Sequence, residues 1–358
     1  MKRSIAALMV LVVVALIAAV ILWSSQYVTV TLKHGGTREE VVDKNGETFV
    51  NILLNIPVGN LAVTGNSPHL LEGNFKYAQG QWDAQIAYLV SSGMGTLSVI
   101  QPNTNGSPPS PTGYEYGVQL SNTVPMSLEV DRVSGDSTLM LNGLLLNTVN
   151  ANLGNGSNTV TLEGEQKTLS TMLINGGNGT DKLNMNCTCD TLSNLVASLG
   201  TGDDSVSLDG TYPQLTSINI DGSTGNDSVM LKGSYPAISS LTLNLGKGDD
   251  SVMLAGDMPS LNTLVMNGGA GNDIFDLDAP WKQNLSATII SESDSTRLKL
   301  PKDIGVMVQV LGKSVTIDSG SLTQQGNDYV NAAYGKSKVT LHITLNTSST
   351  ETVTLVVE

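Results

Sequence analysis

The stretch "LGTGDDSVSLDGTYPQLTSINIDGSTGNDSVML", residues 199–231, contains one short pattern that starts twice. A glycine stands two residues before an aspartate, and an apolar run follows that aspartate. A Gly-x-Tyr-Pro corner and a second apolar run come next, before the glycine-aspartate turn returns. Asp204 and Asp227, the two aligned aspartates, are 23 residues apart. A pattern that returns at a short fixed interval predicts a solenoid with one rung per repeat.

The same register extends in both directions along the chain. The aligned positions, each 23 residues after the last, are Asn158, Asp181, Asp204, Asp227, Asp250 and Asp273. Each has a glycine two residues before it: Gly156, Gly179, Gly202, Gly225, Gly248 and Gly271. No repeat can bury an apolar face alone, so neighbours must stack, with equivalent residues about 4.8 Å apart. The pattern predicts a parallel β-solenoid with 23-residue rungs over residues 158–280.

The acidic turn resembles a known calcium-binding element. "GGAGNDIFD" at residues 268–276 and "GGNGTDKLN" at residues 176–184 match the nonapeptide of RTX calcium-binding β-rolls. Stacked carboxylates repel one another, and Ca²⁺, which takes six to eight oxygen ligands, would remove that cost. This predicts calcium as a cofactor along one edge of the solenoid. The predicted ligands are Asp181, Asp203, Asp204, Asp227, Asp249, Asp250 and Asp273.

A metal-free turn ladder is the alternative for the same edge. Gly, Asn and Asp are the residues that tight turns require in any case. Exposed carboxylates could point apart into solvent, where salt screens their charge. The sequence leaves the two alternatives open.

The N-terminus has the pattern of a membrane anchor. Residues 1–4, "MKRS", are basic and predict a short cytoplasmic start, and residues 5–23 are uncharged and apolar. About twenty such residues span a bilayer as a helix, with the basic end inside. We therefore expect a single-pass bacterial membrane protein with the bulk of the chain outside the cytoplasm. A cleaved signal peptide is the alternative, although no clear cleavage site ends the run.

The remaining chain divides by composition. We expect an N-terminal β-domain at residues 26–101, a Pro/Gly/Ser loop at 102–113 and first solenoid rungs at 114–157. After the repeats, residues 281–358 should form C-terminal rungs and a cap, with the final "ETVTLVVE" as a cap or an edge strand. Cys187 and Cys189 are either reduced or bridged locally, because two ligands are too few for a structural zinc site.

Both flanks of the repeats resemble the toast-rack family of bacterial envelope proteins, which is related to regulators of the cell-wall-antibiotic response. The matching N-terminal segments are "GNLAVTGNSPHLLEGNFKY" (59–77), "AQIAYLVSSGMGTLSVIQ" (84–101), "YEYGVQLSNTVPMSLEV" (114–130) and "LNGLLLNTVNANLGNGSNTVTL" (141–162). The C-terminal ones are "RLKLPKDIGVMVQVLG" (297–312) and "YVNAAYGKSKVTLHITLN" (329–346). The resemblance implies a β-solenoid outside the membrane, with no catalytic residues to carry over. The 23-residue repeats are an expansion relative to that family.

Catalytic and nucleic-acid-binding patterns are absent from the sequence. His34, His69 and His342 are scattered, and no nucleophile elbow or phosphate loop occurs. A net charge of −14 without a basic stripe argues against nucleic acid as a partner. We expect no enzyme but an envelope scaffold or adhesin-like surface module, with an envelope protein or a glycan as partner. A sensor that regulates a membrane partner is the first alternative, and a glycan-active enzyme is the second.

Overall fold

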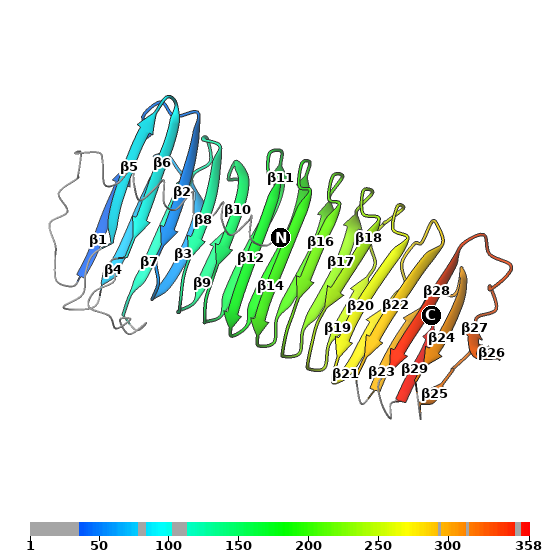
Figure 1. The fold of residues 1–358 in the computed structure, drawn as a ribbon. Helices are drawn as coiled ribbons and strands as arrows, with labels where there is room; N and C mark the ends of the chain where they lie inside the picture. Colours follow the sequence, from blue (N-terminus) through cyan, green and yellow to red (C-terminus); the bar gives the residue numbers. More distant parts are fainter. Residues whose placement is uncertain (1–35, 78–83, 102–112, 293–294, 313–314, 348–351) are drawn as a thin grey trace, which may run out of the picture.

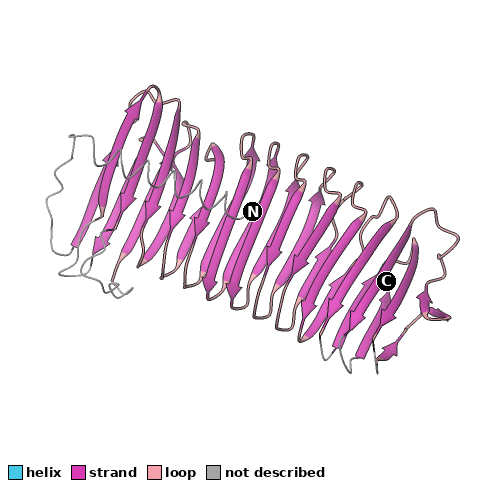
Figure 2. Cartoon of the chain, viewed as in Figure 1, coloured by secondary structure: helices cyan, strands magenta, loops and turns pink. Residues whose placement is uncertain are grey.

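The computed structural model describes residues 36–77, 84–101, 113–292, 295–312, 315–347 and 352–358. Strands and turns make up these ranges, and no helix occurs in them (Figure 2). None of the described segments could therefore cross a membrane as an apolar helix. The anchor predicted at residues 5–23 and almost all of the 102–113 loop lie outside the described residues.

The chain forms two long β-sheets that lie face to face in an elongated molecule (Figure 1). Sheet A contains, in spatial order, β1 (Gly36–Val42), β4 (Leu71–Tyr77), β7 (Glu115–Ser121), β3 (Asn60–Ser67), β9 (Ser137–Met140), β11 (Asn158–Gln166), β13 (Asp181–Cys189), β15 (Ser205–Thr211), β17 (Ser228–Ser234), β19 (Ser251–Leu254), β21 (Asn272–Asp276), β23 (Ser295–Leu300), β29 (Thr352–Val357) and β25 (Thr316–Asp318).

Sheet B is the second layer and runs alongside it. It contains, starting from the same end as β1, β5 (Gln85–Ser91), β6 (Met94–Ile100), β2 (Phe49–Asn55), β8 (Met126–Asp131), β10 (Leu146–Asn152), β12 (Thr171–Asn178), β14 (Asn194–Thr201), β16 (Ser217–Asp221), β18 (Ser240–Asn244), β20 (Thr263–Gly269), β22 (Leu285–Ser291), β28 (Thr340–Thr347), β24 (Gly305–Leu311), β27 (Asp328–Val330) and β26 (Thr323–Gln325).

The predicted 23-residue rung is confirmed. Each repeat contributes one strand to each sheet, and equivalent residues pair in parallel, as Val206 does with Val229 in sheet A and Ile220 with Leu243 in sheet B. The strands begin where the sequence places its two apolar runs, after the aspartate and after the Pro corner. The strands between residues 36 and 100 are the first members of the same two sheets and share their core.

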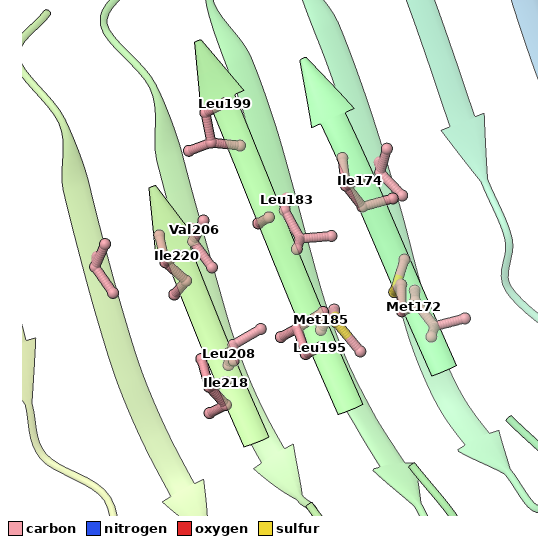
Figure 3. Packing of buried hydrophobic residues seen from close by; sticks show 14 of the residues in the cluster. Met172, Ile174, Leu183, Met185, Leu195, Leu199, Val206, Leu208, Ile218 and Ile220 are labelled. Atoms are coloured by element: carbon pink, nitrogen blue, oxygen red, sulfur yellow. The ribbon is translucent and has the colours of Figure 1, made fainter. Parts of the chain in front are cut away.

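The core is a thin layer of aliphatic side chains between the sheets. Alternate residues of each strand point inward, so Leu183 and Met185 of β13 face Leu195 of β14 (Figure 3). These three side chains are almost completely buried. Burial of one such side chain contributes roughly 1.5–3 kcal/mol relative to exposure. The narrow gap between the sheets explains why the chain contains so few aromatic residues.

Both ends of the solenoid depart from simple winding. The antiparallel pairs β1–β4 and β5–β6 close the N-terminal end, and β24–β27 and β26–β27 close the C-terminal end. The expectation for "ETVTLVVE" was wrong, because β29 lies inside sheet A between β23 and β25. After β23 the chain leaves one rung position empty, and β24 and β25 form in the rung beyond it. Later in the chain, β28 and β29 fill the empty position. The exposed edge of sheet A is instead the three-residue strand β25.

The corner opposite the acidic turns is filled by larger side chains. Tyr212 and Tyr235 stack with ring centroids 5.1 Å apart, and each hydroxyl donates to a backbone carbonyl 27 residues earlier. Cys189 occupies the equivalent place one rung before Tyr212 and forms a disulfide with Cys187. The local bridge, one of the two alternatives for this pair, is the one present.

Candidate functional site

The acidic turns of the repeats stack along one edge, as their spacing predicts. The glycine two residues before each aspartate has positive φ, for example +142° at Gly202 and +133° at Gly225. A Cβ added at Gly225 would also overlap the carbonyl oxygen of Gly202 in the rung before. Glycine is therefore required there both by backbone conformation and by the close stacking of neighbouring turns.

The aligned side chains form an inner column that points into the turns. It consists of Asn158, Asp181, Asp204, Asp227, Asp250 and Asp273, all at most 2% exposed. The backbone N–H of each member donates to Oδ1 of the next: Asp204 N to Asp227 Oδ1 spans 2.9 Å, and Asp227 N to Asp250 Oδ1 spans 2.8 Å. The column is thus a ladder in which each carboxylate satisfies the backbone of the preceding rung.

The residues just before these form an outer column, made up of Ser157, Thr180, Asp203, Asn226, Asp249 and Asn272. Its ladder runs in the opposite direction: Asn226 N donates to Asp203 Oδ1, and Asp249 N donates to Asn226 Oδ1, both at 2.8 Å. These side chains lie nearer the solvent than the inner ones. Two antiparallel series of side-chain-to-backbone bonds therefore tie successive turns together.

The second carboxylate oxygen, Oδ2, of the inner-column aspartates accepts a hydrogen bond in one rung and none in others. Asp181 Oδ2 accepts the N–H of Gly177 at 3.0 Å. The Oδ2 atoms of Asp204, Asp227 and Asp250 are buried and have no hydrogen-bond partner among the described residues. A carboxylate oxygen that is buried away from water and accepts no hydrogen bond makes the ionised form less stable relative to the protonated form.

Burial consequently raises the pKa of the inner carboxyls. Desolvation is the main cause, and neighbouring carboxylates add to it. The pKa of Asp204 rises to about 7, that of Asp227 to about 6 and that of Asp250 to about 7. Desolvation also raises the pKa of Asp181, while its hydrogen bonds from Asn158 and Gly177 act in the opposite direction. The inner column therefore holds protons more strongly than exposed aspartates do.

Asn158 shows what a neutral side chain does at the same position. Its Nδ2 donates to Asp181 Oδ1 at 2.7 Å and to the carbonyls of Gly154 and Gly156 at 3.3 Å. Carbonyl oxygens of the glycine turn thus point toward the column. In this rung they accept hydrogen bonds from the amide of Asn158.

The seven residues predicted to bind calcium divide between the two columns. Five lie in the inner column, where Oδ1 is already occupied by a backbone N–H. Asp203 and Asp249 lie in the outer column, two rungs apart and separated by Asn226. Within the described ranges, no group of three or more His, Cys, Asp or Glu side chains is placed to hold a metal ion. Calcium binding at these carboxylates stays an untested prediction.

The metal-free alternative also needs a correction. It assumed that the carboxylates are exposed and point apart, but the inner ones are buried. In three rungs a glycine leaves space for the carboxylate: a Cβ added at Gly176, Gly222 or Gly268 would overlap the carboxylate oxygen five residues ahead. These glycines make room for the acid groups inside the turn.

Arg132 is a residue of this edge that the sequence pattern does not reveal. Its side chain is buried, and its guanidinium donates to the carbonyls of Gly59, Ser134 and Asp136. Desolvation lowers its pKa to about 10. Arg132 thus supplies donors to turn carbonyls near the N-terminal start of the edge, before the repeated motif begins. A single arginine in "EVDRVSGD" carries no periodic signal, so only the structure identifies it.

Comparisons with solved structures return weak similarities. A proposed cell adhesion protein from Clostridium sporogenes is 17% identical, with 90% of this chain and 100% of that chain covered and a TM-score of 0.26. A proposed adhesin from Parabacteroides distasonis is 11% identical, with 90% and 98% covered and a TM-score of 0.31. These scores are too low to support a statement about fold or function. A comparison with curated proteins finds no match.

One family matches part of the sequence. Residues 32–184 match the N-terminal domain of toast_rack, DUF2154. This range covers β1 to the first residues of β13, and it ends at the second rung of the inner column. The rungs from Asp204 onward lie beyond it. Residues 32–184 are thus similar to the N-terminal domain of the toast-rack family.

Proposed function

We propose that this protein is a membrane-anchored rod of the bacterial envelope, which acts as a scaffold or surface binding module outside the cytoplasm. The observation that carries the proposal is the continuous stacking of both sheets. The larger sheet has 15 strands, which at about 4.8 Å each gives a rod roughly 65 Å long. Antiparallel strands form the N-terminal end of both sheets and the C-terminal end of sheet B, whereas sheet A ends there in the three-residue strand β25, which offers little backbone for further pairing.

The disulfide supports a location outside the cytoplasm. Cys187 and Cys189 are bridged and almost completely buried. Disulfides persist in oxidising compartments and are rare in the cytosol. This agrees with the orientation expected from the basic residues before the apolar segment at 5–23.

The test of location uses the full chain in a bacterial host. A C-terminal alkaline phosphatase fusion should be active, and the protein should stay in the membrane fraction after a carbonate wash. Deletion of residues 5–23 should remove both properties. An inactive phosphatase fusion of a stably expressed chain would contradict the proposed topology.

A sensor that regulates a membrane partner is the second candidate, favoured by the toast-rack match and the family's relation to regulators of the cell-wall-antibiotic response. The two roles differ in their need for the anchor. Replacement of residues 5–23 by an unrelated apolar helix should abolish sensing but leave a scaffold role unchanged. An envelope-stress reporter that responds equally with both anchors would argue against sensing. The proposal includes no catalytic activity.

A further inference from the structure

A hollow of about 600 Å³ lies on the outer face of sheet A, near its N-terminal end. It spans β1, β4, β7, β3 and β9, which are neighbours in the sheet (Figure 1). Asn60, Ala62, Asn74, Gly117, Asp136 and Thr138 line it. The acidic edge uses none of these residues except Asp136, whose Oδ1 accepts the N–H of Ser157 at 2.8 Å.

Gly117 forms part of the floor, and the fold does not require a glycine there. It is not among the residues with positive φ. An added Cβ would find Asn74 O at 3.5 Å and Asn74 Cβ at 3.8 Å, which are ordinary contacts. On the adjacent strand, in contrast, a Cβ at Gly73 would overlap the ring of Phe75. A glycine inside a strand weakens it and often marks the close approach of another molecule.

One side of the hollow carries a salt bridge between a lysine and a glutamate, whose charges balance each other. Lys76 Nζ lies 2.8 Å from Glu115 Oε1, so neither charge is left free. On the opposite side, the carboxylate of Asp136 accepts the N–H of Ser157 and interacts with the Arg132 guanidinium. An anionic ligand would meet this carboxylate and the net charge of −14, and both oppose it.

The rest of the rim offers uncharged donors and acceptors. Asn60 Oδ1 accepts the backbone N–H of Asp136 at 3.2 Å, which leaves its Nδ2 group available. Within the described part of the chain, the amide of Asn74 and the hydroxyls of Thr37 and Thr138 have no recorded hydrogen-bond partner. These groups face a floor made of a glycine and the methyl group of Ala62.

We propose that this hollow binds a neutral sugar residue. Sugar hydroxyls both donate and accept, and the rim provides amides, hydroxyls and a carboxylate for both roles. The apolar C–H face of the ring can lie on Ala62 and Gly117, where no side chain prevents close contact. This inference goes beyond the scaffold role and does not depend on it, because a rod could serve as a scaffold with the hollow unused.

Saturation-transfer NMR and calorimetry on the purified full chain test the proposal. The probes are maltotriose, cellotriose and N,N′,N″-triacetylchitotriose, three neutral trisaccharides. At least one should bind, and Gly117→Val should weaken its binding at least about tenfold by filling the floor. Asn74→Ala should also weaken binding while leaving the floor open. Thermal melts of both variants show whether they fold.

Ser207→Val is the control, since it places a valine on β15 of sheet A outside the hollow. It should leave affinity unchanged. The proposal is overturned if none of the three trisaccharides binds, or if Gly117→Val binds as tightly as the unmodified chain. If Gly117→Val does not fold, unchanged binding by folded Asn74→Ala overturns it instead.

Discussion

The backbone N–H of Asp204 donates to Oδ1 of Asp227, 23 residues later in the chain and 2.9 Å away. The same bond recurs from Asn158 to Asp273, and each carboxylate thereby joins two turns. A hydrogen bond to a charged group is worth more than a neutral one, but only if the charge is otherwise satisfied. The buried Oδ2 of Asp204 has no such partner in the described structure. The column therefore supports the stacking of the rungs at an electrostatic cost.

That cost predicts an unusual dependence of stability on pH. The pKa of Asp204 and Asp250 is about 7 in the folded chain, above the ordinary value of 3.8, so the folded state binds more protons between these limits. The contribution of these two groups to the free energy of unfolding should be greatest below about pH 4 and should fall as pH rises toward 7. We expect the thermal midpoint at pH 8 to lie at least about 5 °C below that at pH 5. Circular dichroism melts measure it, and a higher midpoint at pH 8 would contradict the assignment.

Asp204→Asn should stabilise the chain at pH 8. The amide keeps an oxygen for the N–H of Asp181 and carries no charge, and its nitrogen can donate to the next carboxylate, as Asn158 does at the equivalent position. We expect a gain of roughly 1–3 kcal/mol at pH 8, a smaller gain at pH 5 and a shallower pH profile. Asp203→Asn, in the more exposed outer column, is the matched control and should change stability by less than about 0.5 kcal/mol. Equal effects of the two variants would show that burial is not the cause.

Calcium can be tested on the same edge. Because the inner Oδ1 atoms already accept backbone N–H groups, we expect excess Ca²⁺ and a chelator to give thermal midpoints within about 1 °C of each other. An increase of several degrees with Ca²⁺, lost in Asp227→Asn, would instead support the calcium prediction. Mg²⁺ at the same concentration controls for general ionic screening.

Gly225→Ala should destabilise the stack strongly. Its φ is +133°, and the new Cβ would overlap the carbonyl of Gly202. We expect a loss of more than about 2 kcal/mol, from backbone strain and displaced turns together. Gly164→Ala is the control, because Gly164 also has positive φ, +86°, but has open space around it. Denaturant unfolding compares the two, and equal losses would mean that the close stacking of turns contributes nothing.

The repeat, the two strands per rung and the single acidic edge could all be predicted from the sequence. Their signal is periodic: glycine two residues before the aspartate and apolar residues at alternate positions recur every 23 residues. The ends could not be predicted in the same way. There β28 and β29 enter between strands that precede them in the chain, and a short apolar run does not specify which strand it will pair with.

The sequence by itself determined that Asp181, Asp204, Asp227, Asp250 and Asp273 form a column, since equal spacing forces equal positions in a stack. Only the tertiary structure decided that these carboxylates point inward. The direction depends on neighbouring rungs, because each Oδ1 is held by an N–H of the preceding rung. The hollow at Gly117 likewise exists only in the assembled sheet, where strands far apart in sequence contribute its rim. Spacing along one chain fixes which residues align, whereas burial and charge depend on what the fold places around them.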